Sequence, residues 1–323
     1  MTKDKQFKTV EEQISLLRTR HLKFLDESKA KELLKKYNYF DIINGSENIL
    51  LKSLNPKIYE DVYFEDCFNI YLFDAEIRSL TLKYIFEIEA RLKTSIAYNF
   101  AKINCSSISD TLNYTERAYY QIPSPTNNYL YQTFMKFDLF RKNTVMPNGT
   151  TKLGFIEEKK KDKEYIRNYK NPPFWVTIKD FNFGELYFTY CFFKSDVKEE
   201  VLKDFGFSIS DDLLFQQILH VLKFARNCCA HIELITRFNL LGIKELNNYK
   251  ELKNFTGCKH KKLSYFDLLV LLSKFCDTSE ILKKISEFDL DMYLHGRNHI
   301  SNKLLKRMGN IDMNNWKKVN SFN

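Results

Sequence analysis

Residues that break or turn secondary structure are scarce in this sequence, whose 323 residues include only nine glycines and six prolines. So few turn-forming residues in so long a chain favour long helices over many short strands. No apolar run approaches the roughly 18 residues that a membrane-spanning helix requires. The polar start Met1–Gln6 does not resemble a signal peptide. We therefore expect a cytoplasmic protein with no membrane partner.

Cysteine spacing gives no sign of a disulfide framework or a metal site. The seven cysteines include no C-x-x-C pair, and their odd number argues for a reducing compartment. Cys228 and Cys229 lie near His231 in sequence but lack the ligand spacing of a zinc site. The same holds for Cys258 and His260. We therefore expect free thiols, no metal and no other cofactor.

Acidic residues are outnumbered, because 41 Asp and Glu stand against 50 Lys and Arg and give a formal net charge of +9. This charge permits contact with a polyanion such as RNA, since lysines and arginines release the counterions bound to phosphates. No phosphate-binding loop, dinucleotide fingerprint or serine-hydrolase elbow occurs. Aromatic residues are abundant, with 28 Phe and 19 Tyr. Most of these rings must lie in the core, and an exposed subset can stack on bases.

Apolar residues recur every three or four positions along much of the chain, which predicts an all-α fold. Thr9 and Glu12 form a capping box, which predicts a helix start. Asp41–Gly45 predicts a turn. Trp175 follows two prolines that suit the start of a helix, and we expect it to anchor the core. The expected helices cover residues 9–25, 26–37, 64–102, 183–193, 210–238, 265–275 and 278–289.

We interpret residues 1–323 as a single all-α domain in four parts. N-terminal helices occupy residues 1–102. A loop-rich insertion follows at 103–172, where Asn, Ser, Thr and Pro cluster between short helices. The best-defined helix lies in the part at 173–240, and basic C-terminal helices occupy 241–323.

The helix after Ser210 has two distinct faces. An apolar stripe predicts packing on another helix and comprises Leu214, Ile218, Val221, Ala225, Cys228, Ile232 and Ile235. A polar stripe well away from it comprises Gln216, His220, Lys223, Asn227 and His231. Arg226 lies beside the polar stripe. Asn227 and His231 are four residues apart, so a helix places one above the other.

Arg226, Asn227 and His231 together suit the cleavage of RNA. A phosphodiester in RNA carries its own nucleophile, the 2′-hydroxyl, so cleavage needs proton transfer and a cation but no metal. A histidine, with a reference pKa of about 6.5, can act as general acid or base. An arginine can hold the phosphate oxygens with its bidentate fork, and Asn227 can orient the histidine or the phosphate. From spacing alone, a structural arginine and histidine is the simpler interpretation.

The hexapeptide Arg226–His231 looks like the R-N-x-x-A-H form of the HEPN R-x4-6-H motif in Abi-family proteins. Other landmarks of that family follow in order over residues 9–240. They are Thr9–Leu17, Asn38–Phe40, Ile43–Gly45, Glu87–Tyr98, Pro173–Trp175 and Phe183–Leu186. The sequence therefore resembles the abortive-infection family, and its Asn-Gly landmark and length favour the Abi-F branch over Abi-D.

The resemblance implies a HEPN-like helical bundle with a loop-rich insertion and additional C-terminal helices, in which residues 173–240 hold the motif. It implies an anti-phage protein, commonly a growth-arresting toxin of a toxin–antitoxin pair, related to the HEPN ribonucleases of type VI CRISPR systems. A structured non-coding RNA is the implied partner, phage or host RNA the implied target, and no DNA is expected. HEPN motifs usually face each other in a dimer. Because this chain has one motif, a composite site needs a homodimer.

Basic residues outside the motif are candidates for contacting the RNA backbone, although charges on a helix face are often only solvated. They lie on the long helix at 64–102, on the motif helix, in a lysine cluster next to Tyr265 and Phe266, and in the tail. The candidates are Arg78, Arg91, Lys93, Lys223, Lys259, Lys261, Lys262, Lys306 and Arg307.

Three functions stay open at this point. The first is a metal-independent endoribonuclease, active as a dimer and controlled by its own RNA. The second is an RNA-binding protein that forms a defence complex with its non-coding RNA and does not cleave. The third is a structural helical protein in which the motif residues make core hydrogen bonds.

Overall fold

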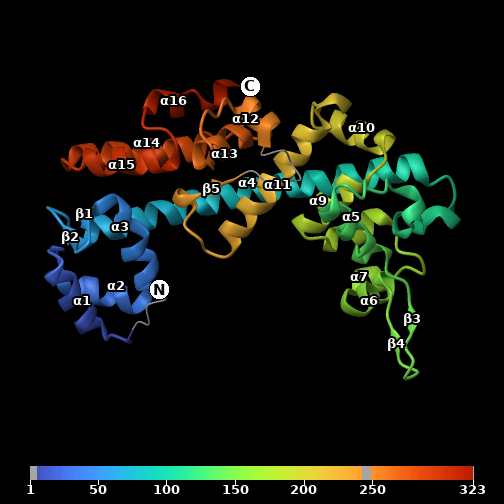
Figure 1. Ribbon diagram of the computed structural model, residues 1–323, viewed down its shortest axis with the longest axis horizontal. Coiled ribbons are helices and arrows are strands. Elements are labelled where there is room, and N and C mark those ends of the chain that lie inside the picture. The colour runs from blue at the N-terminus through green and yellow to red at the C-terminus, as the bar shows by residue number, and fades with distance from the viewer. Residues whose placement is uncertain (1–5, 242–248, 323) are drawn as a thin grey trace. The chain divides into compact units, whose positions relative to one another are not determined.

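Helices dominate the computed structural model, which describes residues 6–241 and 249–322 (Figure 1). Within these ranges the strands form only three short two-stranded sheets. The predicted all-α fold is therefore confirmed. No helix in the same ranges is both long and apolar enough to cross a membrane.

The chain forms two compact units, each assembled from segments that are distant in sequence. The first unit contains Met1–Lys83, Cys228–Asn239 and Ser264–Asn323, and the second contains Tyr84–Asn227 and Leu240–Leu263. The helices α4 (Phe64–Asn104) and α11 (Asp212–Ala230) each contribute residues to both units. The short strands β5 (Asn239–Leu240) and β6 (Leu263–Ser264) fall where the chain passes from one unit to the other.

The first unit begins with α1 (Val10–Thr19) and its predicted capping box, which is confirmed. The Thr9 hydroxyl accepts a hydrogen bond from the Glu12 N–H, and the Glu12 carboxylate accepts one from the Thr9 N–H at 2.7 Å. The other elements that lie within this unit are α2 (Glu27–Lys36), the π-helix η1 (Phe40–Asn44), α3 (Gly45–Leu50), β1 (Leu51–Leu54), β2 (Lys57–Tyr59), η7 (Ile235–Arg237), α13 (Tyr265–Leu272), α14 (Ser279–Leu294), α15 (Asn298–Met308), α16 (Met313–Lys317) and η9 (Val319–Phe322).

Two N-terminal predictions are wrong in detail. The helix expected at 9–25 ends at Thr19, because His21 takes a left-handed backbone with φ 66°. The turn expected at Asp41–Gly45 is instead the π-helix η1, which leads directly into α3. Ile42 and Ile43 are both fully buried, so this segment packs into the core and does not turn on the surface.

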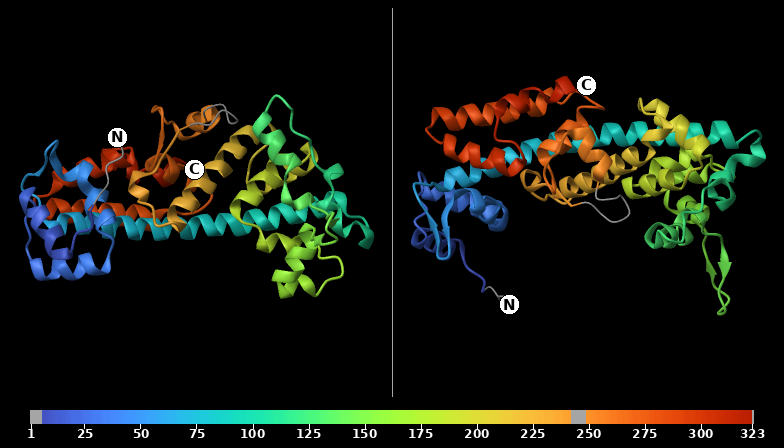
Figure 2. Two further views of the ribbon diagram at one scale, coloured as in Figure 1. Left: turned by 60° about the horizontal axis from the view of Figure 1, so that its bottom comes forward. Right: turned by 45° about the horizontal axis from the view of Figure 1, so that its top comes forward.

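The helices α14 and α15 lie side by side in the C-terminal part of the first unit (Figure 2). The Ser301 hydroxyl on α15 donates to the Asp289 carboxylate on α14. The Tyr265 hydroxyl of α13 lies 2.9 Å from the Thr81 hydroxyl of α4. The C-terminal helices are therefore integral to the core of this unit.

The helix α11 ends at Ala230, eight residues before the predicted end near residue 238. The Glu233 N–H donates to the Cys228 carbonyl at 2.9 Å, and the Ile232 N–H donates to the Cys229 carbonyl at 3.2 Å. Ile232 has a left-handed backbone with φ 60°. This pair of bonds around a left-handed residue is a Schellman cap, which usually carries glycine at the left-handed position. The apolar spacing continues past the cap, so a prediction from periodicity alone places the end of the helix too late in the chain.

The second unit surrounds the C-terminal half of α4 with short helices. The predicted long helix is confirmed, since α4 runs without interruption for 41 residues. The other elements of this unit are η2 (Ile108–Thr115), η3 (Arg117–Tyr119), α5 (Asn128–Met135), η4 (Asp138–Phe140), β3 (Thr144–Val145), β4 (Thr151–Lys152), α6 (Phe155–Asp162), α7 (Glu164–Arg167), α8 (Phe174–Thr177), η5 (Ile178–Asp180), α9 (Phe183–Phe192), α10 (Ser195–Asp204), η6 (Ile209–Asp211) and α12 (Lys250–Thr256).

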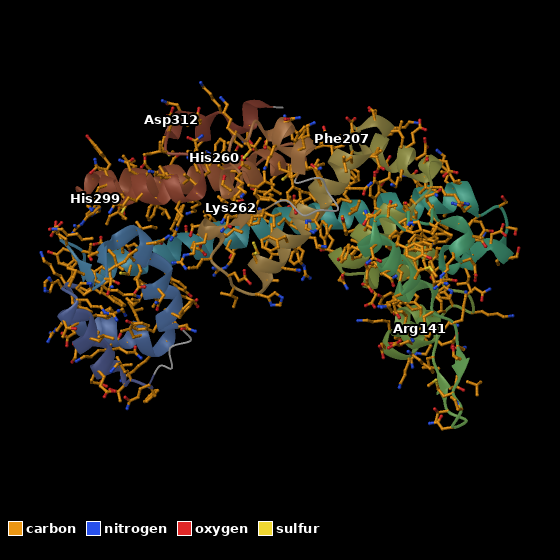
Figure 3. The ribbon with its side chains drawn as sticks, in the orientation of Figure 1. Arg141, Phe207, His260, Lys262, His299 and Asp312 are labelled. Carbon is orange, nitrogen blue, oxygen red and sulfur yellow. The ribbon has the colours of Figure 1, made fainter. Side chains whose placement is uncertain are left out.

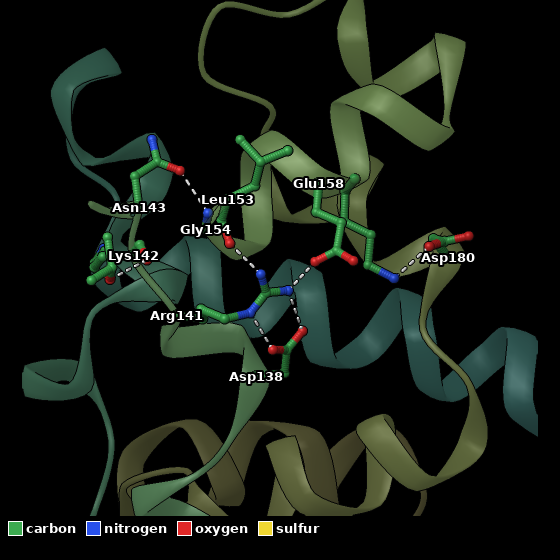
Figure 4. A network of polar contacts seen from close by, with 10 residues as sticks. Asp138, Arg141, Lys142, Asn143, Leu153, Gly154, Glu158 and Asp180 are labelled. Carbon is green, nitrogen blue, oxygen red and sulfur yellow. Dashed lines mark hydrogen bonds and ion pairs between the residues drawn. The ribbon is translucent and has the colours of Figure 1, made fainter. Parts of the chain in front are cut away.

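Arg141 fastens the β3–β4 hairpin to the rest of the second unit (Figure 4). Its guanidinium donates to the Asp138 carboxylate at 2.5 and 3.1 Å, to the Glu158 carboxylate and to the Leu153 carbonyl. Gly154 completes the arrangement, because a Cβ there would lie 2.9 Å from the Arg141 carbonyl oxygen. The hairpin base is therefore held by one half-buried guanidinium and one glycine.

Trp175 does not anchor the core, contrary to the prediction, and 58% of its surface is exposed. The neighbouring Phe174 takes the core position, with its ring centre 4.6 Å from that of Tyr114 and 5.6 Å from that of Phe100. Successive residues of a helix point about 100° apart, so Trp175 is turned away from the interior that Phe174 occupies.

Candidate functional site

The last turns of α11 carry the predicted motif. The predicted apolar stripe is buried within the helix at Val221 and Ala225, which are at most 1% exposed, whereas Ile232 lies beyond the helix end and is 58% exposed. Arg226 is half-buried and Asn227 is exposed. The Arg226 Nη1 lies 3.5 Å from the Asn227 Oδ1, at the outer limit of a hydrogen bond. The Arg226 Nε is buried and has no hydrogen-bond partner among the described residues, so this guanidinium has an unused donor.

His231 directly follows the last residue of α11 and is exposed. The Schellman cap described above fixes the backbone on which its imidazole is carried. Arg226 and Asn227 belong to the second unit and His231 to the first. The motif therefore includes the point in the sequence, between Asn227 and Cys228, where the chain leaves the second unit and enters the first.

Nearer the middle of α11, the predicted polar stripe is half-buried in the second unit. The His220 Nδ1 lies 2.7 Å from the Tyr249 hydroxyl, and the Lys223 Nζ lies 4.5 Å from the centre of the Tyr187 ring. Burial, and then the charge of Lys223, lower the pKa of His220 to about 4. Burial also lowers the pKa of Lys223. Lys223 therefore has a cation–π partner and is less available to phosphate than a surface lysine.

Arg78 and Arg307, two of the predicted RNA-contacting residues, lie in an ion cluster of the first unit. The Asp74 carboxylate is fully buried and accepts from the Arg78 Nη1 at 2.6 Å. It also accepts from the N–H and the hydroxyl of Thr236, each at 2.8 Å. The Arg307 Nη2 donates to the same hydroxyl at 2.7 Å. The two arginines are thus engaged with protein partners.

Burial dominates the electrostatics of this ion cluster. It raises the pKa of the Asp74 carboxyl, against the lowering effect of the Thr236 hydrogen bonds and the Arg78 charge. It lowers the pKa of Arg307 to about 9. Arg237 donates to the Asn44 carbonyl in the same unit, and burial lowers its pKa too. Sequence reasoning missed Asp74, Thr236 and Arg237. The one available signal is the i, i+4 spacing of Asp74 and Arg78.

Arg91 and Lys93 lie on the part of α4 that belongs to the second unit. Arg91 donates to the Asp204 carbonyl at the end of α10, and its guanidinium lies 4.6 Å from the centre of the Phe205 ring. The Lys93 Nζ lies 2.9 Å from a carboxylate oxygen of Glu89. Both side chains therefore have a structural role in addition to any contact with RNA.

The remaining basic candidates are exposed. Lys259, Lys261 and Lys262 surround His260 on a segment of the second unit, where His260 and Lys262 are labelled in Figure 3. Lys306 is exposed near the end of α15, in the first unit. The side chains of these four lysines are exposed, whereas Arg78 is buried and Arg307 is half-buried.

The sequence model of a family described as Abi-like protein matches residues 32–235, which is more than half of the chain. The chain belongs to the Abi-like family. Membership points to a role in abortive-infection defence. The match contains the whole Arg226–His231 motif and α4, whereas α13 to α16 lie beyond it. No curated protein and no solved structure matches the chain.

The two cysteines within the motif of this Abi-like protein, Cys228 and Cys229, are buried. Burial is the largest cause that raises the pKa of the Cys228 and Cys229 thiols to about 12 each. Both thiols therefore stay protonated at neutral pH, and a protonated thiol is neither a nucleophile nor a good metal ligand. Across residues 6–241 and 249–322, no three His, Cys, Asp or Glu side chains gather as metal ligands would.

Proposed function

We propose that this Abi-like protein is an RNA-binding abortive-infection protein that cuts RNA without a metal, as a HEPN-type endoribonuclease. One observation carries the proposal. A member of this family has an R-N-x-x-A-H sequence at the end of α11, with an exposed His231 and a half-buried Arg226 whose Nη1 lies 3.5 Å from the Asn227 Oδ1. An imidazole can transfer protons in 2′-hydroxyl chemistry, and a guanidinium can hold the charge that develops on the phosphate.

In the proposed reaction the 2′-oxygen attacks the adjacent phosphorus and the bond from phosphorus to the 5′-oxygen breaks. His231 removes the proton of the 2′-hydroxyl or supplies one to the leaving 5′-oxygen. Arg226 offsets the charge that develops on the phosphate oxygens, and Asn227 orients the phosphate or the imidazole. The products are a 2′,3′-cyclic phosphate and a 5′-hydroxyl, and no metal takes part.

A homodimer is part of the proposal, because each chain has one motif. A single imidazole cannot act as base and as acid in the same step. Two copies of His231, one from each chain, can divide these roles. The proposal therefore expects that cleavage depends on protein concentration in the range where the dimer forms.

The RNA partner is proposed to be a structured non-coding RNA, with phage or host RNA as the target. The exposed Lys259, Lys261, Lys262 and Lys306 are the best placed of the predicted residues to contact phosphates. Each contact with a phosphate releases counterions, so binding should weaken steeply as salt rises. Arg78 and Arg307, which have buried protein partners, are proposed to support the fold instead.

The test is cleavage of a labelled single-stranded RNA by the full chain in the presence of a chelator. We expect His231→Ala to slow cleavage by about 10²–10⁴-fold, the usual contribution of a general acid or base. The thermal unfolding temperature should not change, because the side chain is exposed.

His260→Ala is the matched control, because His260 is also exposed and lies beside three of the candidate lysines. Its cleavage rate should equal that of the wild type. If His231→Ala cuts as fast as the wild type, the proposed nuclease site is wrong.

The alternative function is an RNA-binding protein that does not cleave, which the single motif per chain favours if the protein acts as a monomer. In that case a discrete RNA remains bound during purification and is released at high salt, while no cyclic phosphate forms. His231→Ala would then either change the affinity for RNA or have no effect, because the wild-type chain would show no RNA cleavage.

A further inference from the structure

A groove of about 890 Å³ lies on the second unit beside the C-terminal half of α4. Its floor consists of small side chains on one face of that helix, spaced four, three and four residues apart. These are Ala90, Thr94, Ala97 and Ala101. The segment α8–η5 supplies Trp175, Ile178 and Lys179 to the same groove. Small residues on one side and a tryptophan on the other leave an open space with apolar walls.

Two large aromatic rings in this groove are exposed to solvent. Trp175 is 58% exposed and Tyr98 is 64% exposed. Trp175 stays outside because Phe174 occupies the core next to Tyr114. An exposed tryptophan that lines an apolar groove often marks a binding surface. Burying so large a ring is favourable, and a bound ligand would provide that burial.

The charged residues that line the groove are all cationic. They are Lys93, Lys102 and Lys179. Lys102 pairs with Glu200 at 2.8 Å and Lys93 pairs with Glu89 at 2.9 Å, so part of their charge is balanced. The Lys179 Nζ lies over the Tyr165 ring, 5.3 Å from its centre, and Lys179 is exposed. Stacking surfaces beside lysines match a ligand with flat rings and negative charge.

We propose that this groove binds an unpaired stretch of RNA, with a base stacked on Trp175 and a backbone phosphate beside Lys179. The inference rests on the RNA binding proposed above and is independent of cleavage. Aromatic stacking accepts any base, and nearby lysines follow the backbone, as in other surfaces that hold single strands. Two copies of this groove are poor partners for each other, because the charged residues that line it are all lysines.

The chain contains two tryptophans, which makes the test direct. Trp316 is 1% exposed and its Nε1 donates to the Asn310 carbonyl at 2.8 Å, so added RNA cannot reach it. We expect the emission of the full His231→Ala chain, used to prevent cutting, to be quenched saturably by a ten-nucleotide oligouridylate or oligoadenylate. Adding Trp175→Phe should abolish that quenching, because only Trp316 then emits.

Affinity is measured in parallel by anisotropy of the labelled oligonucleotide. Trp175→Ala should weaken binding roughly tenfold or more, the usual effect of removing one stacking ring. Lys179→Ala should make the affinity for the oligonucleotide less dependent on salt. The slope of log affinity against log salt should fall by about one, as expected for the loss of one phosphate contact. The matched controls are Tyr293→Ala, which removes a ring that is 67% exposed on α14, and Lys283→Ala, which removes an exposed lysine of the same helix. Neither control should change affinity or salt dependence.

The outcomes separate this inference from the proposed function. If the oligonucleotides bind but quench nothing, and Trp175→Ala binds as tightly as its parent, the groove is not the RNA site although RNA binding stands. If neither oligonucleotide nor any longer RNA binds, the proposed function fails and this inference fails with it. If Trp175 emission changes with protein concentration alone, a second copy covers the groove and the assignment to RNA is wrong.

Discussion

At the scale of single residues, Ile232 has a backbone conformation that suits glycine far better. Its φ of 60° places a β-branched side chain in the left-handed region, directly after the proposed catalytic His231. This conformation costs an L-residue about 1–2 kcal/mol. The side chain recovers little of that energy by burial, because 58% of it is exposed.

Ile232→Gly should therefore stabilise the chain by about 1 kcal/mol, because glycine adopts the left-handed cap without strain. Urea unfolding should show a higher midpoint with an unchanged slope. Ile108→Gly is the matched control, since Ile108 is 90% exposed in η2 and has no positive φ. That substitution should destabilise instead. An Ile232→Gly chain no more stable than the wild type would mean that the cap is not strained.

The buried Asp74 balances the arginines around it, so its removal should be far more damaging than the loss of a surface charge. Asp74→Ala should destabilise the chain by about 3–5 kcal/mol, because Arg78 and the Thr236 N–H lose their acceptor inside the protein. Glu287→Ala on α14 is the control, since it removes only exposed ion pairs worth less than about 1 kcal/mol. Chemical unfolding measures both variants, and equal losses would contradict this account of the cluster.

His220 should make the stability of the protein depend on pH. Its folded pKa of about 4 lies below the ordinary value of 6.5, so the fold favours the neutral ring. The stabilisation is fully present above pH 6.5 and is lost as the pH falls toward 4. Between pH 7 and pH 5 this linkage amounts to about 1–2 kcal/mol. His220→Gln should flatten that part of the stability profile, whereas His260→Gln, at an exposed site, should leave it unchanged.

At the scale of the elements, Arg141 stabilises the β3–β4 hairpin of the loop-rich insertion. Arg141→Ala removes the contacts of the β3–β4 hairpin base with Asp138, Glu158 and the Leu153 carbonyl (Figure 4). We expect a loss of about 1–3 kcal/mol and faster proteolysis within the hairpin. Lys142→Ala, which removes an exposed ion pair with Glu116 and a 3.3 Å hydrogen bond to the Thr115 hydroxyl, should cost less than about 1 kcal/mol and leave proteolysis of the hairpin unchanged. Equal cleavage of the two variants by protease would contradict this role.

Sequence periodicity predicted which segments form helices better than it predicted where the helices end or which side chains they bury. The capping box at Thr9 and the long helix α4 follow from local patterns, because short-range hydrogen bonds and spacing determine them. The end of α11 could not be predicted from the sequence, because the left-handed position of its cap holds Ile232 and not the glycine that usually marks a helix end. The exposure of Trp175 depends on which of two adjacent rings reaches Tyr114, and that contact lies 60 residues away in the chain.

The candidate site divides in the same way. Arg226, Asn227 and His231 could be named from a local motif on one helix. The Asp74 cluster could not, because Thr236 lies 162 residues from Asp74 and Arg307 lies 71 residues from Thr236. The base-stacking groove was equally hidden, because Trp175 was expected inside the core.

At the scale of the whole molecule, the chain combines the Abi-like match at residues 32–235 with C-terminal helices beyond it. Those helices contribute Tyr265 and Arg307 to the core of the first unit, through contacts with Thr81 and Thr236. The net charge of +9 suits a nucleic-acid partner. The central claim is that this protein cuts RNA by using the RNA's own 2′-hydroxyl.

The most direct test compares two versions of one RNA, one with ordinary ribose and one with 2′-O-methyl ribose throughout, incubated with the wild-type chain in chelator. The account predicts that the ribose version is cut to products ending in a 2′,3′-cyclic phosphate, while the methylated version is bound but stays intact. Equal cutting of both versions, or cutting that stops when the chelator is added, would contradict it.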